Sequence, residues 1–126
     1  ELNLVDNVHL IGFKENIIEI INVLDIFILP SLDEGFPIVL LEAMFLGKPI
    51  IVTKVGEIPF ALEHMHNAII INPKSIEEIV SSLLLLYNDS DLRQKLSHNA
   101  SILANKRYTL EIMIKSYLAV YHTFSL

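Results

Sequence analysis

Two carboxylates with a fixed spacing are the side chains of this sequence best suited to chemistry. Glu34 and Glu42 are separated by seven residues where a predicted loop runs into a predicted helix, 37–46. The neighbours of Glu42 are apolar on every side of that helix, so we expect an enclosed helix in which a carboxylate needs a partner. No Lys or Arg stands three or four residues away. Because a ribose offers two adjacent hydroxyl donors, the pattern indicates a ligand that contains a sugar.

The residues between these glutamates predict an anion site. Gly35 has no Cβ and permits close backbone approach. Pro37 suits the first helical position, because its missing N–H would be unpaired there anyway. The N–H groups of Phe36, Ile38 and Val39 then face outward from the positive end of a helix dipole.

Glu34 argues against a bare phosphate as the ligand. A carboxylate about 6 Å from a phosphate, at an effective dielectric near 20, costs roughly 2–3 kcal/mol. A phosphate-linked sugar suits the pair better, because its hydroxyls can donate to the carboxylate and its anomeric carbon is electron-poor. Two simpler interpretations stay open: Glu34 as a solvated loop charge, and Glu42 paired with a Lys distant in sequence.

The elements that position this segment alternate between short apolar runs, typical of buried parallel strands, and stretches with helical spacing. The predicted strands are 8–12, 25–30, 49–53 and 68–71, and the predicted helices are 15–24, 37–46, 76–87, 89–104 and 110–121. This order predicts an α/β fold, with a Rossmann-like parallel sheet of about four strands, flanking helices and a C-terminal helical segment. Ligands of such sheets bind at the carboxyl ends of strands, where the loop after 25–30 lies.

The predicted C-terminal helices show two local sequence patterns: capping residues at their starts and apolar residues at helical spacing. Ser75 and Glu78 form a predicted capping box, and Thr109 can cap the last helix. The predicted buried stripe of the first of these helices is Ile76, Ile79, Val80, Leu83 and Tyr87. The stripe of the last helix is Leu110, Met113, Ile114, Tyr117, Leu118 and Tyr121. Lys106 and Arg107 are interpreted as a solvated helix end rather than a phosphate clamp.

Composition excludes several classes of function. The chain has 126 residues, no Cys and a formal net charge of −6, which fits one domain and argues against nucleic acid. Without Cys there is no disulfide scaffold or thiol catalysis, and a reducing compartment fits. No apolar stretch approaches the ~20 residues of a membrane-spanning helix. Because Glu1 is not an initiator Met and no signal segment precedes the first predicted strand, we expect residues 1–126 to be one truncated domain of a longer chain.

The segment Glu34-Gly-Phe-Pro-Ile-Val-Leu-Leu-Glu42-Ala-Met resembles the E-x7-E segment of the retaining glycosyltransferases of family 4, which have the two-domain GT-B fold. Three flanking segments are similar to the family's strands V-x-F-L-G, A-D-x-F-V-x-P-S and G-x-P-V-V-A-T, namely 8–13, 25–31 and 47–53. The resemblance covers nearly the whole chain and corresponds to the later part of the C-terminal, donor-binding domain.

The resemblance also implies roles. Glu34 would be catalytic and lie near the donor sugar, and Glu42 would hold the ribose hydroxyls. The other donor-binding residues would be Gly35, Phe36, Pro37, Ile38 and Val39, with Gly12 and Phe13 at the start of the nucleobase pocket. No cofactor or metal ion is expected, and His64 with His66 lacks a third ligand nearby in the sequence.

The implied function is transfer of a sugar from a nucleoside diphosphate to an acceptor, in cell-surface polysaccharide or glycoconjugate synthesis. The N-terminal acceptor domain would be absent, so we expect the chain alone to be inactive and to self-associate. The implied location is the cytoplasm, at the membrane face through the absent domain. The alternatives are a fragment of a GT-B nucleotide-sugar epimerase and a receiver-like, non-enzymatic α/β interaction module.

One loop departs from the family pattern. Family members often have Gly-Gly-x-x-E after the strand that corresponds to 49–53. This chain has Glu57 at the second Gly and Phe60 at the Glu, so we expect a stiffer loop with different contacts.

Overall fold

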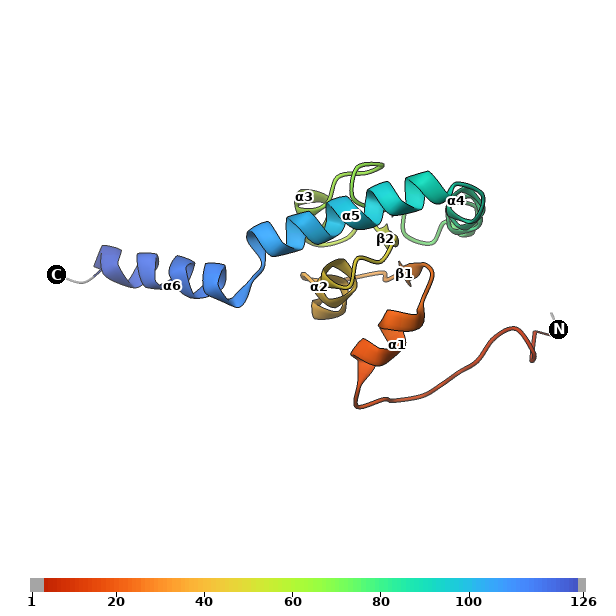
Figure 1. The fold of residues 1–126 in the computed structure, drawn as a ribbon, viewed down its shortest axis with the longest axis horizontal. Helices are drawn as coiled ribbons and strands as arrows, with labels where there is room; N and C mark the ends of the chain where they lie inside the picture. Colours follow the sequence, from red (N-terminus) through yellow and green to blue (C-terminus); the bar gives the residue numbers. More distant parts are fainter. Residues whose placement is uncertain (1–3, 125–126) are drawn as a thin grey trace.

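The computed structural model describes residues 4–124, which fold around a parallel sheet (Figure 1). The sheet contains β1 (Phe27–Leu29), β2 (Ile50–Thr53) and β3 (Ile69–Ile71), hydrogen-bonded in the order β1-β2-β3. Every residue of β2 is buried, as expected for a central strand that is covered on both faces. The predicted α/β class is confirmed, and three of the four predicted strands are present.

Within residues 4–124, six helices surround or extend this sheet. They are α1 (Ile17–Val23), α2 (Ile38–Phe45), α3 (Ile58–Ala61), α4 (Ile76–Asn88), α5 (Ser90–Arg107) and α6 (Leu110–Phe124). The sequence predicts five of them but not α3, whose single turn is too short to show a helical period.

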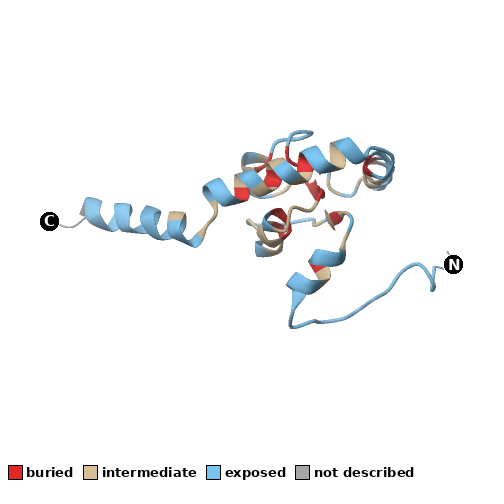
Figure 2. Ribbon diagram, in the orientation of Figure 1, coloured by how far each residue is buried: buried red, intermediate tan, exposed pale blue. Residues whose placement is uncertain are grey.

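The hydrophobic core has two parts, one on each face of the sheet (Figure 2). On one face, Ile50 and Val52 pack with buried residues of α1, α2 and the second half of α5. On the other face, Ile51 packs with Leu86 of α4 and Leu96 of α5. Helix α5 therefore contributes to both parts and fixes α2 against the body of the domain.

The predicted strand at Val8–Gly12 is absent from the structure. These residues are extended and exposed, and Leu10 is 95% accessible. A strand requires a neighbour for its backbone groups, and no segment within residues 4–124 pairs with this one. The sheet therefore has three strands instead of about four.

The predicted buried stripe of α4 is also wrong in part. Ile76, Val80 and Tyr87 are exposed, whereas Ser82 and Leu86 are buried. The apolar residues of α4 lie on more than one face of the helix, and the sheet covers the face that carries Leu86. The cap prediction is half right: Ser75 Oγ accepts from the backbone N–H of Glu78, but the Glu78 carboxylate bonds Asn72 instead of the backbone of Ser75.

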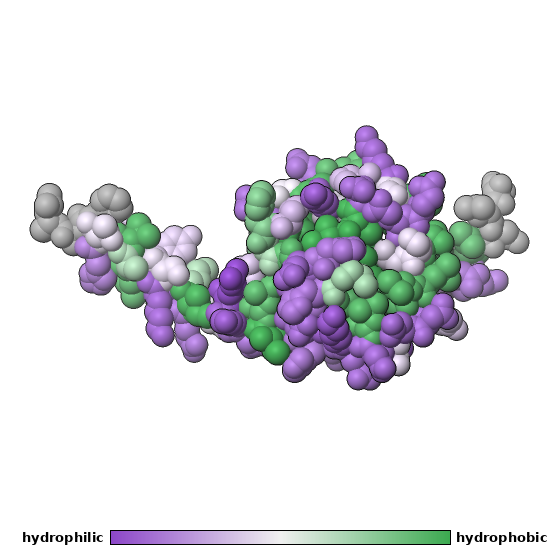
Figure 3. All heavy atoms as spheres, turned by 90° about the horizontal axis from the view of Figure 1, so that it is seen from above, coloured by the Kyte–Doolittle hydropathy of each residue, from purple (hydrophilic) through white to green (hydrophobic). Residues whose placement is uncertain are grey.

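Helix α6 extends away from the rest of the molecule (Figure 1). It is capped by Thr109, whose hydroxyl accepts from the backbone N–H of Ile112 at 3.4 Å. Most of its described apolar side chains are exposed: Leu110, Met113, Ile114, Tyr117, Leu118, Val120 and Tyr121. Hydrophobic patches are visible on both the body and this helix (Figure 3). Across residues 4–124, no helix is both long and apolar enough to cross a membrane.

Candidate functional site

The loop between β1 and α2 lies at the carboxyl end of the sheet and is fastened to β2 by a buried threonine. Thr53, the last residue of β2, is 1% exposed. Its hydroxyl donates to the carbonyl of Ser31 at 2.7 Å and lies 3.3 Å from that of Leu29. This side chain therefore fixes the start of the loop relative to the sheet.

Glu34 is half-buried in this loop and is held by Ser31. The Ser31 hydroxyl donates to Glu34 Oε1 at 2.7 Å. A carboxylate that accepts such a bond has a defined orientation, so Glu34 is not the freely solvated loop charge considered above. Its second oxygen stays available for a ligand, because within residues 4–124 no other hydrogen bond or ion pair engages this carboxylate.

The loop after β2 buttresses the same segment from the side. Gly56 has φ +53°, and a Cβ built there would lie 1.9 Å from the backbone oxygen of Glu34 and 2.6 Å from that of Gly35. The N–H of Glu57 donates to the Gly35 carbonyl at 3.0 Å. Two loops from neighbouring strands therefore form one packed unit around Glu34.

Glu42 lies on the open face of α2. Leu40, Ala43 and Met44 are fully buried on the core side, and Leu41 is partly buried against the same core. Ile38, Glu42 and Phe45 are less covered. Of these, Ile38 is 74% and Phe45 40% exposed. The prediction of a helix enclosed all round is therefore wrong, because the core covers only one face.

Glu42 as a whole residue is half-buried, and its carboxylate has no partner among the described residues, in either a hydrogen bond or an ion pair. The alternative in which a distant Lys pairs with it is therefore not realised in the structure. An apolar face with a single unpaired carboxylate at its centre is a surface suited to a ligand that donates hydrogen bonds.

The N-terminal end of α2 presents open N–H groups, as the sequence predicts. The backbone N–H groups of Phe36, Ile38 and Val39 find no acceptor within residues 4–124. Pro37 is the residue that precedes the helix, with ψ 132°, rather than its first residue. This shift of one position leaves its missing N–H harmless, because the N–H groups at this end are unpaired in any case.

The ring of Phe36 packs against an aromatic ring from the C-terminal part of the chain. It lies against Tyr108, with ring centroids 5.2 Å apart at 34°. Both rings line a cavity of about 300 Å³ together with Glu57 and Phe60. Neither Glu34 nor Glu42 lines it. The donor role predicted for Phe36 therefore falls on its backbone N–H.

The other candidate residues lie elsewhere. Gly12 and Phe13 are in the extended segment before α1, and Phe13 is 91% exposed, so the structure does not bring them to the mouth of α2. His64 Nδ1 accepts from the backbone N–H of Ile70 at 3.0 Å. In the part of the chain that the structure describes, no three His, Asp or Glu side chains gather as metal ligands would.

Three residues of this site escape the sequence analysis as functional candidates: Ser31, Thr53 and Gly56. Ser31 and Thr53 are visible in the sequence only as strand ends. Gly56 could have been found from the sequence, because it keeps the first glycine of the family's Gly-Gly pair although Glu57 replaces the second. A turn with positive φ favours glycine.

The amino-acid sequence matches a family model described as "Glycosyl transferases group 1" over residues 1–102. One relative, 33% identical over 114 residues, is the N,N'-diacetylbacillosaminyl-diphospho-undecaprenol alpha-1,3-N-acetylgalactosaminyltransferase of Campylobacter jejuni; 90% of this chain and 30% of the relative are covered. Another is the UDP-Gal:alpha-D-GlcNAc-diphosphoundecaprenol alpha-1,3-galactosyltransferase of Escherichia coli, 29% identical over 92 residues. The match covers 73% of this chain and 24% of that relative. The chain thus spans about a third or less of the curated relatives it matches.

Solved structures show the same fold. Anabaena Alr3699/HepE in complex with UDP and glucose superimposes with a TM-score of 0.90 at 23% identity, over 96% of this chain and 33% of that one. The C-terminal domain of the group 1 glycosyl transferase LpcC from Francisella tularensis gives a TM-score of 0.71 at 35% identity, over 79% and 53%. The expected α/β fold, part of a GT-B C-terminal domain, is confirmed.

Proposed function

Because this chain belongs to the glycosyl transferases group 1 family, we propose that it is the donor-binding part of an enzyme that transfers a sugar from a nucleoside diphosphate to an acceptor. In this proposal the configuration at the anomeric carbon is retained. The acceptor domain belongs to the remainder of a longer protein, and the chain alone is inactive. The family match argues against the receiver-like alternative.

The observation that carries the proposal is the arrangement of Glu42 and the start of α2. The half-buried residue Glu42, whose carboxylate has no partner among the described residues, lies one turn beyond open N–H groups of the same helix. A nucleoside diphosphate offers both complements: its phosphates accept from N–H groups, and its ribose hydroxyls donate to a carboxylate. Burying that carboxylate against an apolar face is tolerable when the ligand supplies the hydrogen bonds.

Glu34 has a different role in the proposed reaction. As the bond between sugar and diphosphate breaks, positive charge develops at the anomeric carbon and negative charge on the leaving phosphate. A carboxylate fixed by Ser31 stabilises the first charge. The N–H groups at the start of α2 stabilise the second, so the proposal requires no bound metal ion.

The names of similar proteins suggest which compounds to test first. UDP appears in the description of the Anabaena structure and UDP-Gal in the name of the Escherichia coli relative. The Campylobacter jejuni and Escherichia coli relatives are both named for diphospho-undecaprenol compounds. These names support a lipid-linked acceptor in glycoconjugate synthesis. We propose that the longer protein acts at the cytoplasmic face of the membrane.

The test uses the longer protein, with UDP and UDP-sugars as probes. Titration calorimetry should show that Glu42→Ala weakens UDP binding about tenfold or more, because two hydrogen bonds to a charged group are lost. Glu34→Gln should lower kcat for sugar transfer roughly 100-fold with little change in KM. Ser31→Ala should lower kcat less than Glu34→Gln does, since it leaves the carboxylate in place but free to turn.

Glu77→Gln is a matched control, because Glu77 is an exposed carboxylate on α4, away from this site. Glu77→Gln should change neither the affinity for UDP nor kcat for sugar transfer. Unaltered UDP affinity in Glu42→Ala, together with unaltered kcat in Glu34→Gln, would show that the site is assigned wrongly. Conversion of the UDP-sugar to its epimer without an acceptor would instead support the epimerase alternative.

A further inference from the structure

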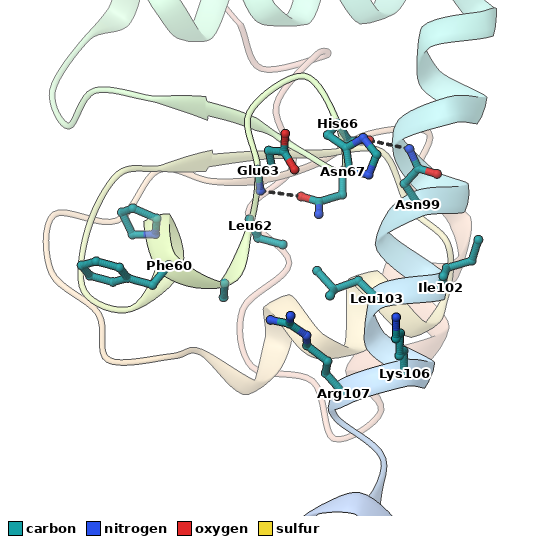
Figure 4. Close-up of a pocket in the computed structure, with 12 residues that line it drawn as sticks. Phe60, Leu62, Glu63, His66, Asn67, Asn99, Ile102, Leu103, Lys106 and Arg107 are labelled. Atoms are coloured by element: carbon teal, nitrogen blue, oxygen red, sulfur yellow. Dashed lines mark hydrogen bonds between the residues drawn. The ribbon is translucent and has the colours of Figure 1, made fainter.

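A second cavity, of about 490 Å³, lies between the segment joining α3 to β3 and the C-terminal half of α5 (Figure 4). Leu62 and Leu103 line it from the two sides. None of the proposed donor-binding residues from Glu34 to Glu42 is among its lining residues. It is therefore separate from the site described above.

A nearly buried amide points into this cavity with one group unused. Asn67 is 6% exposed, and its Oδ1 accepts from the backbone N–H of Glu63 at 2.9 Å. Its Nδ2 faces the cavity (Figure 4) and donates to no acceptor within residues 4–124. The nitrogen is not fully enclosed, because none of the fully buried side-chain polar atoms among the described residues lacks a partner. It is therefore open to the cavity and available to a ligand that accepts a hydrogen bond.

Two cations stand at the other end of the cavity. Lys106 and Arg107 form the last turn of α5, and the Arg107 guanidinium extends beneath Leu62 (Figure 4). Neither forms an ion pair with a carboxylate among the described residues. The acidic residue of the lining, Glu63, has its carboxylate turned away from Arg107 (Figure 4). The pair is exposed, as a solvated helix end would be, but it also lines a cavity.

We infer that this cavity binds the phosphate group of a phosphate ester. A guanidinium presents two parallel N–H donors that match phosphate oxygens, and Lys106 adds a second positive charge. Asn67 supplies a neutral donor from the opposite wall. The volume exceeds that of a bare phosphate, and the apolar part of the lining, which includes Leu62, Ile102 and Leu103, suits the organic part of the ester. That ester could be a small soluble compound or a lipid headgroup, which share this chemistry.

Amide NMR spectra of the isotope-labelled chain test the inference, with phenyl phosphate as the soluble probe. The side-chain amide signal of Asn67 and the guanidinium signal of Arg107 should shift and saturate. Benzoate should bind at least about tenfold more weakly, because it has one charge and cannot offer three oxygens to three donors. Phosphatidylcholine vesicles with and without phosphatidylglycerol test the lipid source.

Arg107→Gln should weaken phenyl phosphate binding about tenfold. Asn67→Asp should weaken it as much, because it keeps the acceptor for Glu63 but replaces the unused donor with a negative charge. Lys115→Gln on α6 removes the same charge as Arg107→Gln outside the cavity and should change nothing.

Binding to vesicles with phosphatidylglycerol that Arg107→Gln abolishes, without binding of phenyl phosphate, would support the phosphate site with a lipid as its source. No shift with either probe, or shifts that both variants leave unaltered, would overturn the inference. Shifts confined to residues 36–42 would report the proposed donor site alone, so the two proposals can fail separately.

Discussion

Replacing Gly56 with Ala should show how tightly the two loops around Glu34 are packed. The new Cβ would lie 1.9 Å from the Glu34 carbonyl oxygen, whereas real Cβ contacts essentially never fall below 3.0 Å. One loop must therefore move by about an ångström. Because the opposing atoms are backbone, no side-chain rotation can relieve the contact. The displacement should also break the hydrogen bond from the Glu57 N–H to the Gly35 carbonyl.

The cost has two separable parts. A positive φ costs Ala roughly 1–2 kcal/mol relative to Gly. The steric displacement adds about 1–3 kcal/mol and the lost hydrogen bond about 1 kcal/mol. Gly47→Ala isolates the first part, because Gly47 has φ +61° but a Cβ there would meet nothing within 4 Å. Gly56→Ala should therefore lose roughly 2–4 kcal/mol more of the free energy of unfolding than Gly47→Ala.

Urea unfolding followed by far-UV circular dichroism measures this difference, since the chain has no Trp for fluorescence. With a slope of about 2 kcal/mol per molar, the midpoint of Gly56→Ala should lie about 1–2 M below that of Gly47→Ala. Equal midpoints for the two variants would refute the reasoning. They would mean that the loop after β2 does not press on the backbone of Glu34 and Gly35.

Two further predictions concern stability. Thr53→Val should lower the free energy of unfolding by about 1–3 kcal/mol relative to Thr53→Ser, because Val keeps the shape but loses the hydroxyl that bonds Ser31; equal urea midpoints would contradict this. The backbone N–H of Asn72, followed by its side-chain amide, lowers the pKa of Glu78 below 4.5. The stability that Glu78 contributes is therefore present above pH 4.5 and lost as the pH falls through the lower, folded-state pKa. The melting temperature of Glu78→Gln should lie below that of the natural chain at pH 7 and approach it in acid, and a constant difference down to pH 3 would argue against the effect.

The parts of the fold that follow from local patterns are predictable from the sequence. The apolar runs at β1, β2 and β3 identify buried strands, and the stop signal at Gly47 ends α2 where the structure ends it. The segment at Val8–Gly12 has an equally apolar pattern but no strand. The apolar pattern of a segment shows which side chains it can bury. Whether the segment forms a strand also depends on a neighbouring strand that hydrogen-bonds to its backbone. The face of α4 that is buried is likewise decided by the sheet, because the helix is apolar on more than one side.

In the candidate site, too, features within one segment are predictable from the sequence, whereas contacts between segments are not. The spacing of Glu34 and Glu42 and the open N–H groups follow from the sequence of one segment, whereas the absence of a distant Lys beside Glu42 is known only from the structure. The hydrogen bond of Ser31, the tie from Thr53 and the contact of Gly56 join segments 20 residues or more apart, or depend on a turn conformation. No pattern along the chain reports such contacts.

The loop after β2 explains why Glu57 is tolerated where the family commonly has a second glycine. Its φ is −81°, an ordinary value that any residue adopts, whereas Gly56 has φ +53°. Glu57 forms hydrogen bonds through its backbone alone: its N–H donates to the Gly35 carbonyl, and its carbonyl accepts from the N–H groups of Phe60 and Ala61. Its side chain is exposed. The packing of the two loops thus requires a glycine at position 56 alone. The carboxylate at 57 instead joins Phe36, Phe60 and Tyr108 around the neighbouring cavity, so the departure changes the lining of that cavity and leaves the support of Glu34 intact.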